Sequence, residues 1–353
     1  MKDTTANRFL YLDHLRLIAS VAVVILHVAA WKWDALDWRT FEWSTFNIYD
    51  SLVRWCVPIF VMISGALFLS KDIDIRTMWK KYISRIMAAF LFWSLLYALY
   101  EYFVAHSIHG FGAFVAMLFT GNYHMWFLYM LAGLYMITPF VRQIVKKKEL
   151  VIYFVILAFV FAMLLPELIQ ILSLAKLGAA DTLSAITGNI FVQMVMGYTG
   201  YYILGYYLHT HQLRRSLEII LIILGVLSIL FTLFGTSYIS APTNERNTAL
   251  YGFLRVNVFF PAVALFTVLK NHTGRKAPSE RKKNVWKYLS KCCFGVYLIH
   301  PMLLAISEKC FKITTLSFHP AFSIPVISIC VFIVSLILSG LLNKIPWFNK
   351  WLI

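Results

Sequence analysis

The chain of 353 residues is 60% hydrophobic and 17% aromatic, and only 14% of its residues are charged. A soluble domain carries about a quarter charged residues, so this composition excludes a disordered chain and a soluble enzyme with a conventional surface. On a soluble chain, the formal net charge of +16 would suggest a nucleic-acid partner. On a chain this apolar, we expect the basic excess to lie in loops on one side of a membrane, with no nucleic acid bound.

Apolar stretches of about 20 residues, the length of a membrane-spanning helix, recur from one end of the sequence to the other. We predict an all-α integral membrane protein with about ten transmembrane helices, near 13–31, 47–70, 84–105, 124–142, 150–171, 189–209, 216–236, 249–270, 290–310 and 321–342. A further apolar run at 111–119 is too short to span. Because no long polar segment remains, we predict one membrane domain over 1–353 and no separate soluble domain.

Most lysines and arginines lie in alternate loops, beginning with the N-terminal segment. Under the positive-inside rule this asymmetry predicts that both termini are cytoplasmic. A cleaved signal peptide over 1–30 is the alternative, but Arg16 and His27 within the first apolar stretch argue against it. The five cysteines have no zinc-type spacing, so we predict no metal site.

Arg16 and His27 are ionisable residues within the first predicted span, where charge is costly and marks a site by default. They are eleven positions apart, which is about three helical turns, so both side chains project from nearly the same face of the helix. Along the helix axis they are about 16 Å apart. Asp13 lies one turn before Arg16 and could pair with it. Structural alternatives are that Arg16 extends to the interface and that His27 bridges two helices.

Other polar or aromatic side chains in the predicted spans lie mostly toward the outer half. They are Arg54, Ser64, Glu101, His124, Trp126, Arg255 and His300. Structural ion pairs are the alternative for Arg54, Glu101 and Arg255. For His300, which precedes a proline, the alternative is a helix kink.

Four segments in register along the chain resemble the acyltransferase 3 family of bacterial multi-pass membrane acyltransferases. The stretch 12–27, with ten residues between its arginine and its histidine, resembles the family's first helix. Residues 58–65 are similar to its second-helix motif, 124–128 to its His-x-Trp-Phe segment, and 295–301 to its C-terminal motif. The family usually has ten spans, as predicted here.

The resemblance implies an O-acyltransferase of the bacterial cytoplasmic (inner) membrane. Such a protein moves an acyl group, usually acetyl, from acyl-coenzyme A to a hydroxyl of a cell-surface or lipid-linked glycan, and needs no permanently bound cofactor. Family members often carry Arg-x-x-x-Arg before the third helix, whereas this chain has Lys81 and Arg85. Lys81 supplies charge but no bidentate fork.

These residues predict a division of roles along the bundle. His27 is the expected general base on the acceptor hydroxyl, or else becomes transiently acylated itself. The expected catalytic residues are His27, Arg16 and Asp13, and the expected donor-binding residues are Arg16, Lys80, Lys81 and Arg85. The loop 275–291 is a further candidate for the coenzyme A phosphates. The expected acceptor-binding residues are Arg54, Glu101, His124 and Trp126, with Ser64, Arg255 and His300 as further candidates.

A transporter or flippase of a lipid-linked sugar or small solute is the alternative function, because it would also have many spans and intramembrane charge. Discontinuous helices in two related halves would favour it, and the sequence shows no clear internal repeat.

Overall fold

A computed structural model describes residues 9–190, 192–242, 245–273 and 279–353. Over these ranges the chain is helical and has no strand, as predicted. The α-helices are α1 (Leu10–Ala30), α2 (Phe41–Val53), α3 (Cys56–Phe68), α4 (Ile75–Thr77), α5 (Ser84–Tyr100), α6 (Phe111–Thr120), α7 (Trp126–Ile144), α8 (Lys148–Phe159), α9 (Leu165–Leu174), α10 (Ala179–Gly188), α11 (Thr199–Thr210), α12 (Arg215–Ser240), α13 (Val256–His272), α14 (Glu280–Phe311), α15 (Pro320–Leu342) and α16 (Pro346–Trp351). Short 3₁₀ or π-helical turns connect or extend them: η1 (Trp33–Ala35), η2 (Met78–Ile83), η3 (Glu101–Ala105), η4 (Val160–Leu164) and η5 (Gln193–Val195).

The number of helices that could span a membrane differs from the prediction. Within the described ranges, eight helical segments are long and apolar enough to cross, against the ten predicted. The predicted spans at 189–209 and 249–270 correspond to α11 and α13, which have only 12 and 17 residues. The short run predicted at 111–119 forms α6, which has no buried residue.

Helix α11 is short but deeply packed, because glycines bring it against α3. A Cβ on Gly65 would lie 1.8 Å from the carbonyl oxygen of Tyr202, and a Cβ on Gly205 would lie 2.1 Å from that of Met62. Only the absence of a side chain allows two backbones to approach this closely, as in small-residue contacts between membrane helices.

The predicted second span is broken in two at Arg54, between α2 and α3. Pro58 has no N–H to donate to the carbonyl four residues earlier, which belongs to Arg54, so the helix cannot continue regularly through this point. The break places the Arg54 side chain toward the centre of the bundle, where it lines a cavity.

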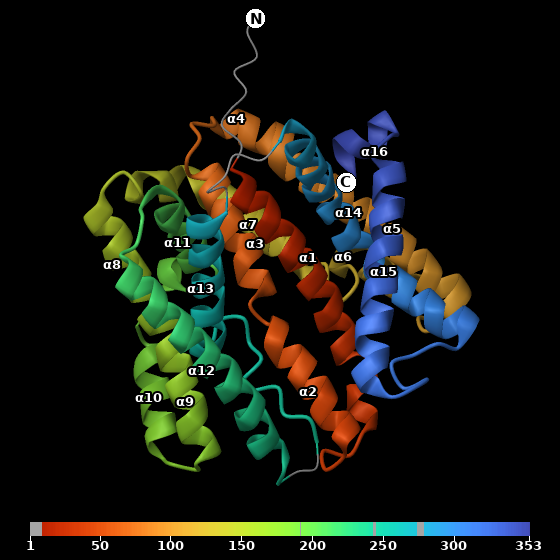
Figure 1. The fold of residues 1–353 in the computed structure, drawn as a ribbon, viewed down its shortest axis with the longest axis horizontal. Coiled ribbons are helices and arrows are strands. Elements are labelled where there is room, and N and C mark those ends of the chain that lie inside the picture. Colours follow the sequence, from red (N-terminus) through yellow and green to blue (C-terminus); the bar gives the residue numbers. More distant parts are fainter. Residues whose placement is uncertain (1–8, 191, 243–244, 274–278) are drawn as a thin grey trace, which may run out of the picture.

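Helix α1 runs through the middle of the bundle and contacts α2, α3, α14 and α15 (Figure 1). Side chains join Arg16 to Ser290 and His27 to His300. A step of eleven positions along α1 thus matches a step of ten along α14 in the same chain direction, so the two helices run parallel. The start of α1 and the C-terminal helix α16 lie at the same end of the bundle (Figure 1).

Candidate functional site

A cavity of about 490 Å³ lies inside the bundle, against α1, α3, α7 and α14. Along α1 its wall extends from Arg16 to Ala30, about 21 Å at the helical rise. The α1 residues on the wall are Arg16, Val23, Leu26, His27 and Ala30, which follow one helical face. The cavity therefore joins the two residues that the sequence singled out, at two depths.

His27 and His300 form a hydrogen-bonded pair, with His27 Nδ1 2.6 Å from His300 Nε2 and the rings nearly parallel. His300 Nδ1 lies 3.0 Å from the Val296 carbonyl oxygen, which only accepts, so Nδ1 must carry the proton. In a neutral His300, Nε2 is then an acceptor and the His27 Nδ1–H donates to it. A neutral His27 consequently keeps its lone pair on Nε2, the atom that a general base requires.

Tyr97 holds the part of α14 that carries His300. Its hydroxyl donates to the Leu298 carbonyl oxygen at 2.9 Å and accepts the Met302 N–H at 3.1 Å. In a regular helix these two backbone groups would bond to each other, so Tyr97 is inserted into the helical ladder. The insertion lies beside Pro301, which already interrupts the ladder by lacking an N–H. The backbone hydrogen bonding of α14 is thus interrupted at Pro301, next to His300 of the His27 pair.

Arg16 lies at the other end of the cavity wall. Its Nη1 donates to Ser290 Oγ at 2.6 Å and lies 3.7 Å from Asp13 Oδ1. Asp13 is buried and is not on the cavity wall. Its position one turn before Arg16 allows it to orient the guanidinium, as the sequence suggested.

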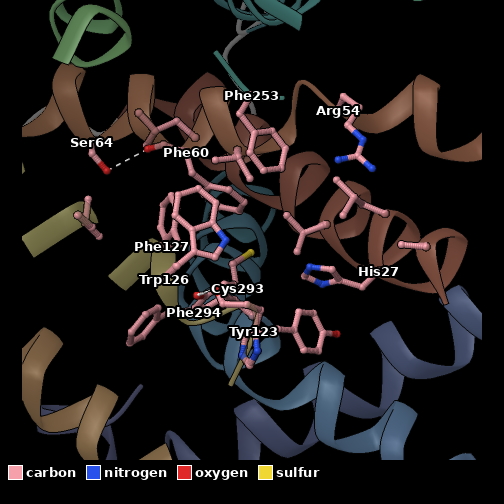
Figure 2. A pocket seen from close by; sticks show the side chains of 18 of the residues that line it. His27, Arg54, Phe60, Ser64, Tyr123, Trp126, Phe127, Phe253, Cys293 and Phe294 are labelled. Carbon is pink, nitrogen blue, oxygen red and sulfur yellow. Dashed lines mark hydrogen bonds between the residues drawn. The ribbon is translucent and has the colours of Figure 1, made fainter. Parts of the chain in front are cut away.

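Arg54 enters the cavity from the α2–α3 break. It forms an ion pair with fully buried Asp50, and its guanidinium carbon lies 4.2 Å from the centre of the Tyr251 ring. Arg54 and His27 project into the same cavity (Figure 2). A cation held by a buried acid is thereby fixed above the histidine pair.

Ser64, His124 and Trp126 also line the cavity. The Ser64 hydroxyl donates to the Phe60 carbonyl oxygen at 2.9 Å, the bond drawn in Figure 2. The Trp126 ring is stacked on Phe253 at 5.9 Å between centroids. The Trp126 and Phe253 rings give this part of the cavity an aromatic wall.

Four other sequence-predicted residues lie outside the cavity wall. Lys80 and Lys81 are exposed on η2. Glu101 accepts a hydrogen bond from Ser107 in a separate surface hollow, and Arg255 donates to the Pro166 carbonyl oxygen at 3.0 Å. The structure does not bring these residues to Arg16 or His27.

Arg85 is also off the wall, since it donates to the backbone carbonyls of Asn349 and Ile353. Of the predicted loop 275–291, positions 275–278 lie outside the described residues, Ser279 is the N-cap of α14, and 280–291 are helical as part of α14. In the described part of the chain, no three His, Cys, Asp or Glu side chains are placed to hold a metal ion.

The structure adds cavity residues that the sequence did not suggest. Tyr123, Tyr297, Cys293, Phe253 and Arg246 all line the wall. Spacing offered a signal for two of them, because Cys293 and Tyr297 precede His300 by seven and three residues, on one helical face. Arg246 and Phe253 lie between α12 and α13, where no periodic pattern marks them.

The fold and the site together define a multi-pass helical membrane protein with a largely apolar cavity that Arg16, His27 and Arg54 line. A family model described as "Acyltransferase domain" matches residues 9–344, nearly the whole chain. The chain therefore belongs to the acyltransferase 3 family and is a multi-pass membrane acyltransferase. No curated protein and no solved structure matches it.

Proposed function

We propose that this protein is an O-acyltransferase that moves an acyl group from cytoplasmic acyl-coenzyme A to a sugar hydroxyl. The observation that carries the proposal is the placement of Arg16 and His27 at two depths of one cavity, with His300 hydrogen-bonded to His27. A transporter needs no such base, whereas attack of an alcohol on a thioester does.

In the proposed reaction, His27 Nε2 takes the proton of the acceptor hydroxyl as its oxygen bonds to the thioester carbon. The carbon–sulfur bond then breaks, and the coenzyme A thiolate takes the proton from His27. His300 holds the other His27 nitrogen protonated throughout, which keeps Nε2 directed to this task. The products are the acylated sugar and free coenzyme A, so atoms and charge balance. Transient acylation of His27 is the alternative route, and an acyl-protein trapped by acid quench would favour it.

Donor binding is proposed to centre on Arg16. The roughly 16 Å between Arg16 and His27 along α1 suits an extended pantetheine arm, with the thioester at His27 and anionic groups near Arg16. Exposed Lys80 and Lys81 are proposed to meet phosphates at the surface. Arg85 would first have to release its two backbone carbonyls.

The acceptor is proposed to occupy the outer half of the cavity, against Trp126 and Arg54. Aromatic and charged groups together suit a sugar ring. Within the family, the chain resembles the O-acetyltransferase of enterobacterial common antigen. On that resemblance we propose acetyl as the acyl group, a cell-surface or lipid-linked glycan as the acceptor, and the bacterial inner membrane as the location.

The function is tested in membrane vesicles supplied with acetyl-coenzyme A carrying a labelled acetyl group. Label should enter the glycolipid fraction with the wild-type chain and with the control His109→Gln, which changes an exposed histidine that does not line the cavity. His27→Ala should lose about 10²–10⁴-fold in rate. Equal activity of His27→Ala and wild type would remove His27 as the base.

The proposed orientation is tested separately, with single cysteines on a cysteine-free background. A membrane-impermeant thiol reagent added from outside should label Asp37→Cys and not Lys283→Cys. Both positions are exposed, so accessibility depends on the side of the membrane. The opposite pattern would invert the topology.

A further inference from the structure

His124 is a buried histidine whose hydrogen bonds are missing. It is only 2% exposed, yet neither Nδ1 nor Nε2 has a hydrogen-bond partner among the described residues. A buried polar group without a partner is costly, so one that persists requires an explanation. The side chain lines the same cavity as His27, which points to a bound group as the missing partner.

The backbone of His124 is held by a hydrogen bond, whereas its ring nitrogens make none with the described residues. The Tyr297 hydroxyl donates to the His124 carbonyl oxygen at 2.7 Å. Edges of Tyr97 and Tyr297 pack around the ring at 5.4 and 5.2 Å between centroids, and both hydroxyls are engaged with backbone groups. An imidazole in this aromatic surrounding is held neutral, with one N–H and one lone pair.

The His124 ring lies close enough to His27, the proposed base, for one bound group to contact both. The His124 centroid lies 6.4 Å from that of His27 and 5.8 Å from that of His300. In a tetrahedral intermediate, the attacking oxygen would lie about 2.8 Å from one imidazole nitrogen and the oxyanion about 2.8 Å from a donor on the other side. Two imidazoles around one such carbon would have their centres about 8 Å apart, so the His27 and His124 rings must separate slightly as the group enters.

Tyr123 packs beside both histidines. Its ring meets His27 edge-on at 5.3 Å and His124 at 5.6 Å. It is 64% exposed, in contrast to buried Tyr97, so an incoming acyl group can displace it without disturbing the core. Displacement would open His124 to the same group that reaches His27.

We propose that His124 donates its imidazole N–H to the carbonyl oxygen of the donor thioester and stabilises the negative charge formed there. This inference rests on the proposed acyl transfer. As the acceptor oxygen bonds to the carbonyl carbon, its proton passes to His27 and the C=O electron pair moves onto the oxygen beside His124. When the carbon–sulfur bond breaks, that pair returns to the carbonyl and the thiolate takes the proton from His27. His124 keeps its own proton in both steps.

The test compares three variants of the full chain in membrane vesicles. His124→Phe removes the donor and keeps a ring, whereas His124→Asn and His124→Gln place an amide N–H near the Nδ1 and Nε2 positions. His109→Gln is the matched control. With labelled acetyl-coenzyme A, label is counted both in glycolipid and as free acetate from hydrolysis.

Loss of one preorganised oxyanion donor lowers kcat by about 10²–10³-fold. We expect this loss in His124→Phe for transfer and for hydrolysis alike, with little change in KM for acetyl-coenzyme A. One of the two amide variants should recover part of the rate. The unfolding temperature of His124→Phe should be equal to or above that of wild type, because the unpartnered group has been removed.

Three results would overturn the inference. The first is unchanged hydrolysis with a raised KM for the acceptor alone, which would make His124 an acceptor-binding residue. The second is full activity of all three variants. The third is a lowered unfolding temperature in His124→Phe with neither amide restoring rate, which would indicate a structural role. If wild type itself yields neither product, the proposed function fails together with the inference.

Discussion

Replacing His300 by phenylalanine tests the arrangement of the histidine pair without removing the proposed base. The substitution deletes the Nε2 acceptor that lies 2.6 Å from His27 Nδ1, and leaves that N–H unpartnered. An unsatisfied buried donor costs about 1–3 kcal/mol. In the variant, the tautomer of His27 with its proton on Nε2 avoids the unpartnered N–H and is therefore favoured. That tautomer has no lone pair on Nε2, which the proposed base requires. If the active protonation state becomes less favourable by that amount, kcat falls about 5- to 150-fold.

The assay is acetyl transfer in vesicles at saturating donor, with donor affinity measured separately to show that the cavity is intact. His300→Gln, whose amide oxygen can accept from His27, should retain more activity than His300→Phe. Because the two histidines act as a unit, the double variant His27→Ala with His300→Phe should be no slower than His27→Ala alone. Wild-type activity in His300→Phe, or losses that multiply in the double variant, would refute the reasoning.

Three further predictions concern other parts of the structure. Arg16→Ala should raise the Kd for acetyl-coenzyme A about 10- to 150-fold, which corresponds to the loss of one hydrogen bond to a charged group. An unchanged Kd in equilibrium binding would exclude a role for Arg16 in binding acyl-coenzyme A. Tyr97→Phe should lower the unfolding temperature in detergent, because the Leu298 carbonyl and the Met302 N–H both lose the Tyr97 hydroxyl as a partner. Each unsatisfied backbone group lowers the free energy of unfolding by about 1–3 kcal/mol. An unaltered melting curve would contradict this. Gly65→Ala should reduce the yield of folded protein, since its Cβ would lie 1.8 Å from the Tyr202 oxygen, while Gly133→Ala, with nothing within 4 Å, should not; equal yields would show that the α3–α11 contact relaxes freely.

The fold class could be predicted from the sequence because burial of backbone polar groups in lipid permits few structures. Long apolar segments must be helical in a bilayer, so hydropathy alone indicated an all-helical membrane protein. The number of long helices was less predictable. Helix α11 has only 12 residues and is packed inside the bundle on a glycine contact, and hydropathy does not distinguish burial in protein from burial in lipid.

The sequence by itself also singled out Arg16 and His27, since ionisable groups are conspicuous in an apolar helix and their spacing defines one face. It could not show that His300 fixes the proton on His27, because that depends on two residues 273 positions apart meeting across parallel helices. The sequence also could not show that Arg85 donates to backbone carbonyls of the C-terminal segment and does not line the cavity. Local pattern determined which residues are costly in a membrane, and the packing of α1 against α14 decided which of them share one cavity.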